Sequence, residues 1–161
     1  MEGTYYFIIV GVLLFEYALS TISSTLNMNS ITEDIPDGFQ DYYDKNKYAK
    51  SQSYLKDKTR FGLFTGTFSL CITLVIIHAG LFGLLDDFVR AYSNHYITSG
   101  LLFFGTLFIL NDVINLPFSI YGTFVIEEKY GFNKTTWKTY VSDKFKGYGL
   151  TIVLGSAVMV P

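Results

Sequence analysis

Few side chains in this 161-residue sequence are placed to take part in catalysis or binding. The most distinctive polar side chains lie just before a proline. Asn111, Asp112 and Asn115 interrupt an otherwise apolar stretch just ahead of Pro117. Polar side chains inside an apolar segment usually face protein or a water-filled cavity, and proline frees a backbone carbonyl nearby. We therefore expect these three polar side chains to line an interior chamber. Hydrogen bonding between helices, with no chamber, is the open alternative.

Two adjacent acids follow the same stretch. Glu127 and Glu128 are neighbours, and neighbours on a helix point about 100° apart, so they make a poor acid–base pair. We expect them to have structural roles, such as ending the apolar segment or pairing with lysine. Docking of a downstream domain is the alternative. Gly131, shortly after them, fits the C′ position of a helix.

Metal-binding and nucleophilic side chains are scarce. His78, His95 and Cys71 are the only soft ligands, too few for a complete zinc site. The sequence contains no HExxH, CxxC, GxSxG or glycine-rich phosphate loop. A single cysteine forms no internal disulfide. The chain alone is therefore expected to bind no metal, and its net charge of -2 predicts no nucleic-acid partner.

The elements that would position these residues are membrane helices. Half of the residues are hydrophobic, only 16% are charged, and the charges are clustered, which is typical of an integral membrane protein. Apolar runs long enough for the ~30 Å hydrocarbon core occupy residues 5–22, 61–85 and 99–126. A fourth run, residues 147–161, is too short to span. The prediction is an all-α, polytopic protein with three full spans and an incomplete fourth.

The loops between these runs are expected to hold amphipathic helices. Aromatic residues predict a short helix within residues 40–55, on the membrane surface or a partner domain; a solvated helical loop is the alternative. Aromatic residues from Trp137 to Tyr148 share one helical face bordered by lysines, which is typical of a helix in the membrane interface.

Basic residues predict the orientation in the membrane. Loops 23–60 and 127–147 hold six and five of the twelve Lys and Arg residues, and the link between the second and third runs holds one. Because excess Lys and Arg mark cytoplasmic loops, both large loops are expected to be cytoplasmic and the N-terminus outside or lumenal.

Three runs resemble the N-terminal membrane domain of the type I CAAX prenyl proteases, which are integral-membrane zinc metalloproteases. Two are Lys50–Tyr54 and Asp57–Phe61, and the most specific is LPFSIYGTFVIEEKYGFN at Leu116–Asn133. The resemblance covers nearly the whole chain. It marks a structural signature of Pro117, Glu127, Glu128, Gly131, Phe132 and Asn133. Two short runs, Arg60-Phe61-Gly62 and Thr67-Phe68-Ser69-Leu70, look more like the bacterial branch. This likeness predicts a bacterial inner membrane rather than the endoplasmic reticulum.

This resemblance implies a barrel of membrane helices around a water-filled chamber. It also implies a C-terminal catalytic half whose HExxH histidines and a later Glu hold zinc, with the HExxH Glu as general base. The family cleaves near the C-terminus of prenylated CAAX proteins. None of those catalytic positions exists here, so the expected role is the membrane part of such a protease, in contact with the bilayer, the catalytic half and a peptide or prenylated protein substrate. The alternative is a non-catalytic membrane scaffold or interaction module.

Overall fold

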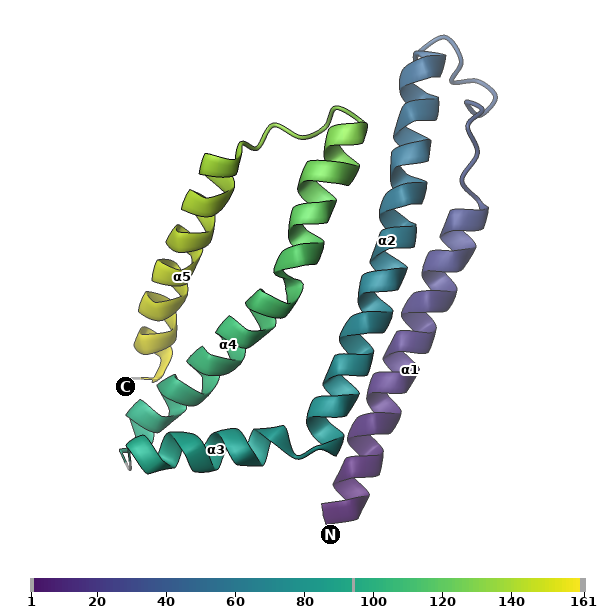
Figure 1. Ribbon diagram of the computed structural model, residues 1–161. Helices are drawn as coiled ribbons and strands as arrows, with labels where there is room; N and C mark the ends of the chain where they lie inside the picture. The colour runs from purple at the N-terminus through teal and green to yellow at the C-terminus, as the bar shows by residue number, and fades with distance from the viewer. Residues whose placement is uncertain (1, 94, 160–161) are drawn as a thin grey trace. The chain divides into compact units, whose positions relative to one another are not determined.

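The computed structural model describes residues 2–93 and 95–159, which form helices joined by loops, the longest of them residues 30–44 (Figure 1). The helices are α1 (Glu2–Asn29), α2 (Lys45–His78), α3 (Leu81–Tyr92), α4 (Tyr96–Tyr121), the π-helix η1 (Gly122–Glu127) and α5 (Trp137–Met159). No strand occurs among the residues described, so the all-α prediction is confirmed. The chain divides into two compact units, one of residues 1–75 with 121–132 and one of residues 76–120 with 133–161.

Among the described residues, three helical segments are long and apolar enough to cross a membrane. They are Gly3–Asn29, Lys45–His78 and Tyr96–Glu127, of 27, 34 and 32 residues. At 1.5 Å per residue, even the shortest is about 40 Å long and exceeds the hydrocarbon core. The predicted polytopic fold with three full spans is therefore confirmed, although which turns lie in the bilayer stays a prediction.

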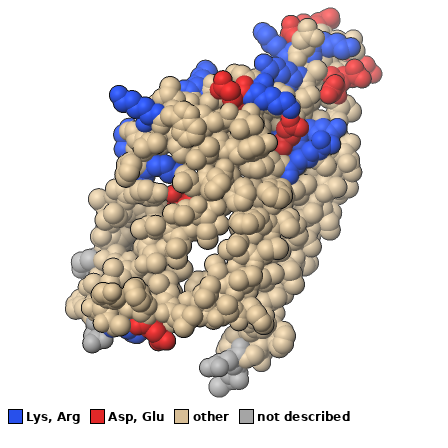
Figure 2. Space-filling view, viewed as in Figure 1, with Lys and Arg blue, Asp and Glu red and all other residues tan. Residues whose placement is uncertain are grey.

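In the first unit, α1 and α2 run side by side in opposite directions (Figure 1). Tyr17 Oη and Thr67 Oγ1 lie 2.6 Å apart. Since the Thr67 hydroxyl donates to the Leu63 carbonyl at 2.8 Å, Tyr17 is the donor to Thr67. Figure 2 shows the charged side chains of this unit gathered at the end that holds the α1–α2 loop, with an uncharged visible surface along the rest of both helices. This distribution suits helices that cross lipid.

The prediction of a separate short helix within residues 40–55 is wrong. Those residues lead directly into α2, which begins at Lys45 and continues through the apolar run to His78. Asp44 caps the helix, because its Oδ1 accepts a hydrogen bond from the Lys47 amide at 2.9 Å. No glycine or proline occurs between Lys45 and Phe61, so nothing ends the helix there.

The prediction that one continuous helix covers residues 61–85 is also wrong. Gly80 adopts φ 66°, a left-handed conformation that glycine tolerates, and the chain restarts as α3 at Leu81. The small residues Gly62 and Gly66 of α2 could allow another helix to approach closely, but the described structure shows no such approach. A Cβ added at either glycine would meet no other atom of the described structure within 4 Å, apart from its own helix and chain neighbours.

The second unit contains α3, α4 and α5. The loop before α5 ends at Thr136, whose Oγ1 accepts a hydrogen bond from the Thr139 amide at 3.2 Å and caps the helix. The interfacial helix expected at residues 137–148 and the apolar run that follows form one continuous helix, α5. Helices tolerate isolated glycines at a cost of about 1 kcal/mol, so Gly147 and Gly149 do not separate the two parts.

Candidate functional site

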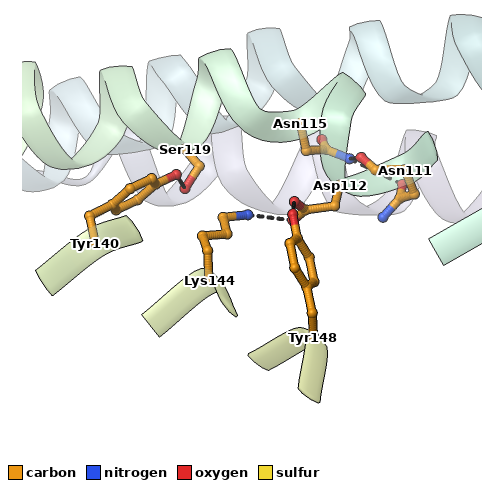
Figure 3. A network of polar contacts seen from close by, with 7 residues as sticks. All are labelled: Asn111, Asp112, Asn115, Ser119, Tyr140, Lys144 and Tyr148. Carbon is orange, nitrogen blue, oxygen red and sulfur yellow. Dashed lines mark hydrogen bonds and ion pairs between the residues drawn. The ribbon is translucent and has the colours of Figure 1, made fainter. Parts of the chain in front are cut away.

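Asp112 of α4 accepts hydrogen bonds from two side chains of α5 (Figure 3). Lys144 Nζ donates to its Oδ1 and the Tyr148 hydroxyl donates to its Oδ2. The Asp112 and Lys144 side chains are only 19% and 26% exposed. A carboxylate inside an apolar segment is costly unless it is paired, and here a cation and a hydroxyl satisfy it. We call Asp112, Lys144 and Tyr148 the Asp112 cluster.

A second contact continues this line of polar groups. The Tyr140 hydroxyl donates to Ser119 Oγ at 2.8 Å. Residues 140, 144 and 148 are spaced four apart and residues 112 and 119 seven apart, so each set lies on one helical face. The two faces meet with the helices antiparallel, since Tyr140 pairs with the later α4 residue and Tyr148 with the earlier one (Figure 3). From the sequence, Lys144 is one of the lysines that border the predicted interfacial helix. The four-residue spacing of Tyr140, Lys144 and Tyr148 is the signal that places the three side chains on one face.

Asn111 and Asn115 are oriented differently from Asp112. Asn115 Nδ2 donates to the Asn111 carbonyl at 2.8 Å and to Asn111 Oδ1 at 3.1 Å, so both bonds run along α4 itself (Figure 3). Of the three residues expected to line one chamber, only Asp112 is seen bonded to α5. The helix also continues through Pro117, whose missing amide leaves the Val113 carbonyl without its usual donor, and widens into η1 after Tyr121.

The two acids of the signature end a helix through their backbone. The Phe132 amide donates to the Glu127 carbonyl and the Gly131 amide to the Glu128 carbonyl, both at 2.9 Å. With Gly131 at φ 65°, this is a Schellman motif with glycine at C′, as its sequence position predicts. Further on, Asn133 Oδ1 accepts a hydrogen bond from the Thr135 amide at 2.7 Å and shapes the loop that leads to α5.

The same loop is attached to α2 through Asp57. Asp57 Oδ2 accepts hydrogen bonds from Lys129 Nζ at 2.6 Å and from the Tyr130 hydroxyl at 2.7 Å. We call these three residues the Asp57 cluster. Lys129 and Tyr130 lie beyond the last candidate span, and the Asp57 carboxylate raises the pKa of both groups above their ordinary values because it bonds their protonated forms.

Aromatic rings extend the Asp57 contact. The Tyr54 ring packs edge-on against Tyr130 and Phe132, with ring centroids 5.6 and 4.8 Å apart. The Phe61 ring, also on α2, packs against the Tyr121 ring, with ring centroids 5.0 Å apart. Residues 54, 57 and 61 share one face of α2, since they are spaced three and four apart. The three runs singled out in the sequence therefore meet at one place in the first unit, which no single run predicts.

The described residues do not fit the zinc ion that the resemblance implies. No three His, Cys, Asp or Glu side chains among residues 2–93 and 95–159 are grouped so that they could hold a metal. Cys71 is exposed on α2, and the His95 amide donates to Ser93 Oγ at 3.2 Å in the link before α4. No catalytic step through zinc follows from these residues.

The helices and their paired polar groups define a multi-pass integral membrane protein. Residues 24–161 match the family model described as CAAX prenyl protease N-terminal, five membrane helices. The chain belongs to this family.

Individual relatives agree with this assignment. The chain is 37% identical over 142 residues to the probable CAAX prenyl protease 1 of Schizosaccharomyces pombe, covering 80% of this chain and 30% of that protein. It is 30% identical over 127 residues to the human CAAX prenyl protease 1 homolog, covering 74% and 27%. The crystal structure of S. mikatae Ste24p superposes with a TM-score of 0.87 at 26% identity, covering 96% of this chain and 38% of that chain. The chain thus spans about 30% of the length of the curated relatives it matches.

The expected bacterial branch, and with it the bacterial inner membrane, is wrong. The matching relatives come from eukaryotes, among them two yeasts, rice and human. The short runs Arg60-Phe61-Gly62 and Thr67-Phe68-Ser69-Leu70 contain too few residues to separate branches of one family.

Proposed function

We propose that this chain builds part of the chamber wall of a zinc metalloendopeptidase that cleaves near the C-terminus of CAAX-type or other membrane substrates. The observation that carries the proposal is the TM-score of 0.87 to S. mikatae Ste24p over 96% of the chain. The zinc ligands and the general base would lie in the part of such a protease that this chain does not match.

Within that protease, the task of the chain is to hold helices in place. The apolar second half of α5 would enter the bilayer as a fourth membrane segment beside α4, attached by the Asp112 cluster and by the Tyr140–Ser119 contact. Asn111, Asp112 and Asn115 would face the chamber. The bond between Asn111 and Asn115 leaves other hydrogen-bonding capacity on both amides, which water in a chamber could use.

The orientation follows from charge. Loops 23–60 and 127–147 would face the cytoplasm and the N-terminus the lumen or exterior. The lone basic residue between α2 and α4, Arg90, lies on α3 and is paired with Asp86 at 2.8 Å, so it adds little to the charge bias on that side.

Cysteine labelling tests the chamber. In the native protein that contains this chain, with Cys71→Ser as background, Asn111→Cys and Asn115→Cys are treated with a water-soluble, membrane-impermeant maleimide. Val113→Cys is the matched control, since Val113 is 56% exposed on the same two turns and is apolar. Rapid labelling at 111 and 115 with slow labelling at 113 is expected. Equal, slow labelling at all three positions would show that lipid or protein, not water, surrounds the amides.

A separate measurement tests the protease. The purified native protein is assayed for bound zinc and for cleavage of a farnesylated CAAX peptide. Bound zinc together with chelator-sensitive cleavage is expected. A well-inserted protein with neither zinc nor cleavage would instead favour a non-catalytic membrane scaffold.

A further inference from the structure

Helix α3 presents three different faces to its surroundings. Leu81, Leu84, Phe88 and Tyr92 form an apolar stripe, since they are spaced three and four residues apart. They are 42%, 62%, 60% and 75% exposed. Val89, about 100° around the helix from Phe88, is buried at 3% exposure. Helix α3 thus buries Val89 and leaves a continuous apolar stripe exposed.

The charged side chains of α3 lie on the remaining face. Arg90 Nε and Asp86 Oδ2 form an ion pair at 2.8 Å, with the Arg90 side chain 65% exposed. Asp87 is exposed and lies about 100° around the helix from Phe88. Water-facing charge and an exposed apolar stripe therefore lie along the same short helix.

Helix α3 comes directly before a candidate membrane span. Only residues 93–95 separate its end from α4, and α4 begins a candidate span. A fully extended chain from Tyr92 to Tyr96 reaches about 14 Å at most, so the end of α3 stays close to the start of this candidate span. At 12 residues, α3 is about 18 Å long and too short to cross. In Figure 1, α3 and α4 meet at an angle where α3 ends and α4 begins.

We propose that α3 lies in the plane of the membrane interface, with Leu81, Leu84, Phe88 and Tyr92 in the headgroup and acyl boundary of the lipid. The occupant of the stripe is the lipid surface itself, because the helix is joined to a membrane span and carries its charges away from the stripe. Phe88 and Tyr92, whose ring centroids are 5.0 Å apart, supply the aromatic surface that favours this depth.

Spin labels on neighbouring residues test the proposal. In the native protein with Cys71→Ser as background, Phe88→Cys and the matched control Asp87→Cys are each labelled with a nitroxide in phosphatidylcholine–phosphatidylserine vesicles. Collision rates with oxygen, which partitions into lipid, and with a water-soluble nickel chelate are then compared. The ratio of oxygen to nickel collisions is expected to be severalfold higher at position 88 than at 87.

Three outcomes would overturn it. Equal access of the nickel chelate to both labels would place α3 in water. Oxygen-dominated collisions at both would place α3 inside the hydrocarbon. An immobile label at 88 that neither reagent reaches would mean that protein covers the stripe. If Phe88→Cys does not insert, Tyr92→Cys on the same stripe replaces it against the same control.

Discussion

Asp112 and Lys144 form an ion pair that joins α4 to α5 across 32 residues of sequence. Tyr148, one turn further along α5, bonds the second oxygen of the same carboxylate. One acidic side chain of α4 thus binds two residues of α5. The sequence of α5 had predicted a helix in the membrane interface. The cluster explains why a charge is tolerated within an apolar segment.

Replacing Asp112 by leucine is expected to lower protease activity without preventing membrane insertion. Asp112→Leu removes both acceptors and leaves the half-buried Lys144 ammonium without its partner, so the free energy of unfolding should fall by about 1–3 kcal/mol. Thermal unfolding in detergent and cleavage of a farnesylated peptide measure the two effects. Ser119→Ala, which loses only the exposed Tyr140 contact, should change both far less. Normal turnover by inserted Asp112→Leu protein would remove any role of this side chain in activity.

Asp57 substitutions should loosen residues 127–132. Asp57→Ala removes the acceptor for both Lys129 and Tyr130, whereas Asp57→Asn keeps one oxygen that Tyr130 can use. Backbone hydrogen exchange in residues 127–132 is therefore expected to rise most in Asp57→Ala and less in Asp57→Asn. Asp143→Asn is the control, because its 3.4 Å contact with Lys146 is exposed and should hold little structure. Identical exchange in all four proteins would show that the hydrogen bonds to Asp57 do not hold these residues in place.

The contribution of the Asp57 cluster to stability should disappear at high pH. The pKa values of Lys129 and Tyr130 are raised in the folded protein, mainly by hydrogen bonds to Asp57. Groups with a raised folded pKa stabilise fully below their unfolded pKa, about 10 for both, and lose this effect as pH rises through the folded pKa. Between pH 9 and 11, the wild-type melting temperature should therefore fall more steeply than that of Tyr130→Phe. Parallel pH profiles would contradict the linkage.

Gly131→Ala should destabilise the signature turn. Gly131 has φ 65°, which costs a residue with a Cβ about 1–2 kcal/mol, and the new Cβ would lie 3.5 Å from Lys50 Nζ. Gly147→Ala is the matched control, because Gly147 lies inside α5 with open space around it. That change should stabilise the protein by about 0.5–1 kcal/mol, since alanine is the better helix former. Chemical unfolding of both variants measures the contrast, and two changes of the same sign would refute it.

Local chemistry in the sequence was sufficient for several features. Long apolar runs with few charges predicted a polytopic helical protein because the bilayer requires about 20 apolar residues for each crossing. Gly131 was predicted at a helix C′ position because few other residues adopt positive φ there. The string at Leu116–Asn133 was specific enough to indicate the family, while its branch was predicted wrongly.

Only the tertiary structure decided which residues meet. Asp57 bonds Lys129 72 residues away, and Asp112 bonds Tyr148 36 residues away. Periodicity assigns a residue to a face of its own helix, but it does not say which face of which other helix lies opposite. Hydropathy did not predict that α2 begins at Lys45 and ends at His78, because it shows only which residues can lie in lipid. The helix begins at the Asp44 cap, and it ends before Gly80, which adopts a left-handed conformation. The sequence by itself therefore determined the class of protein and its family, and the packing of the helices decided the contacts.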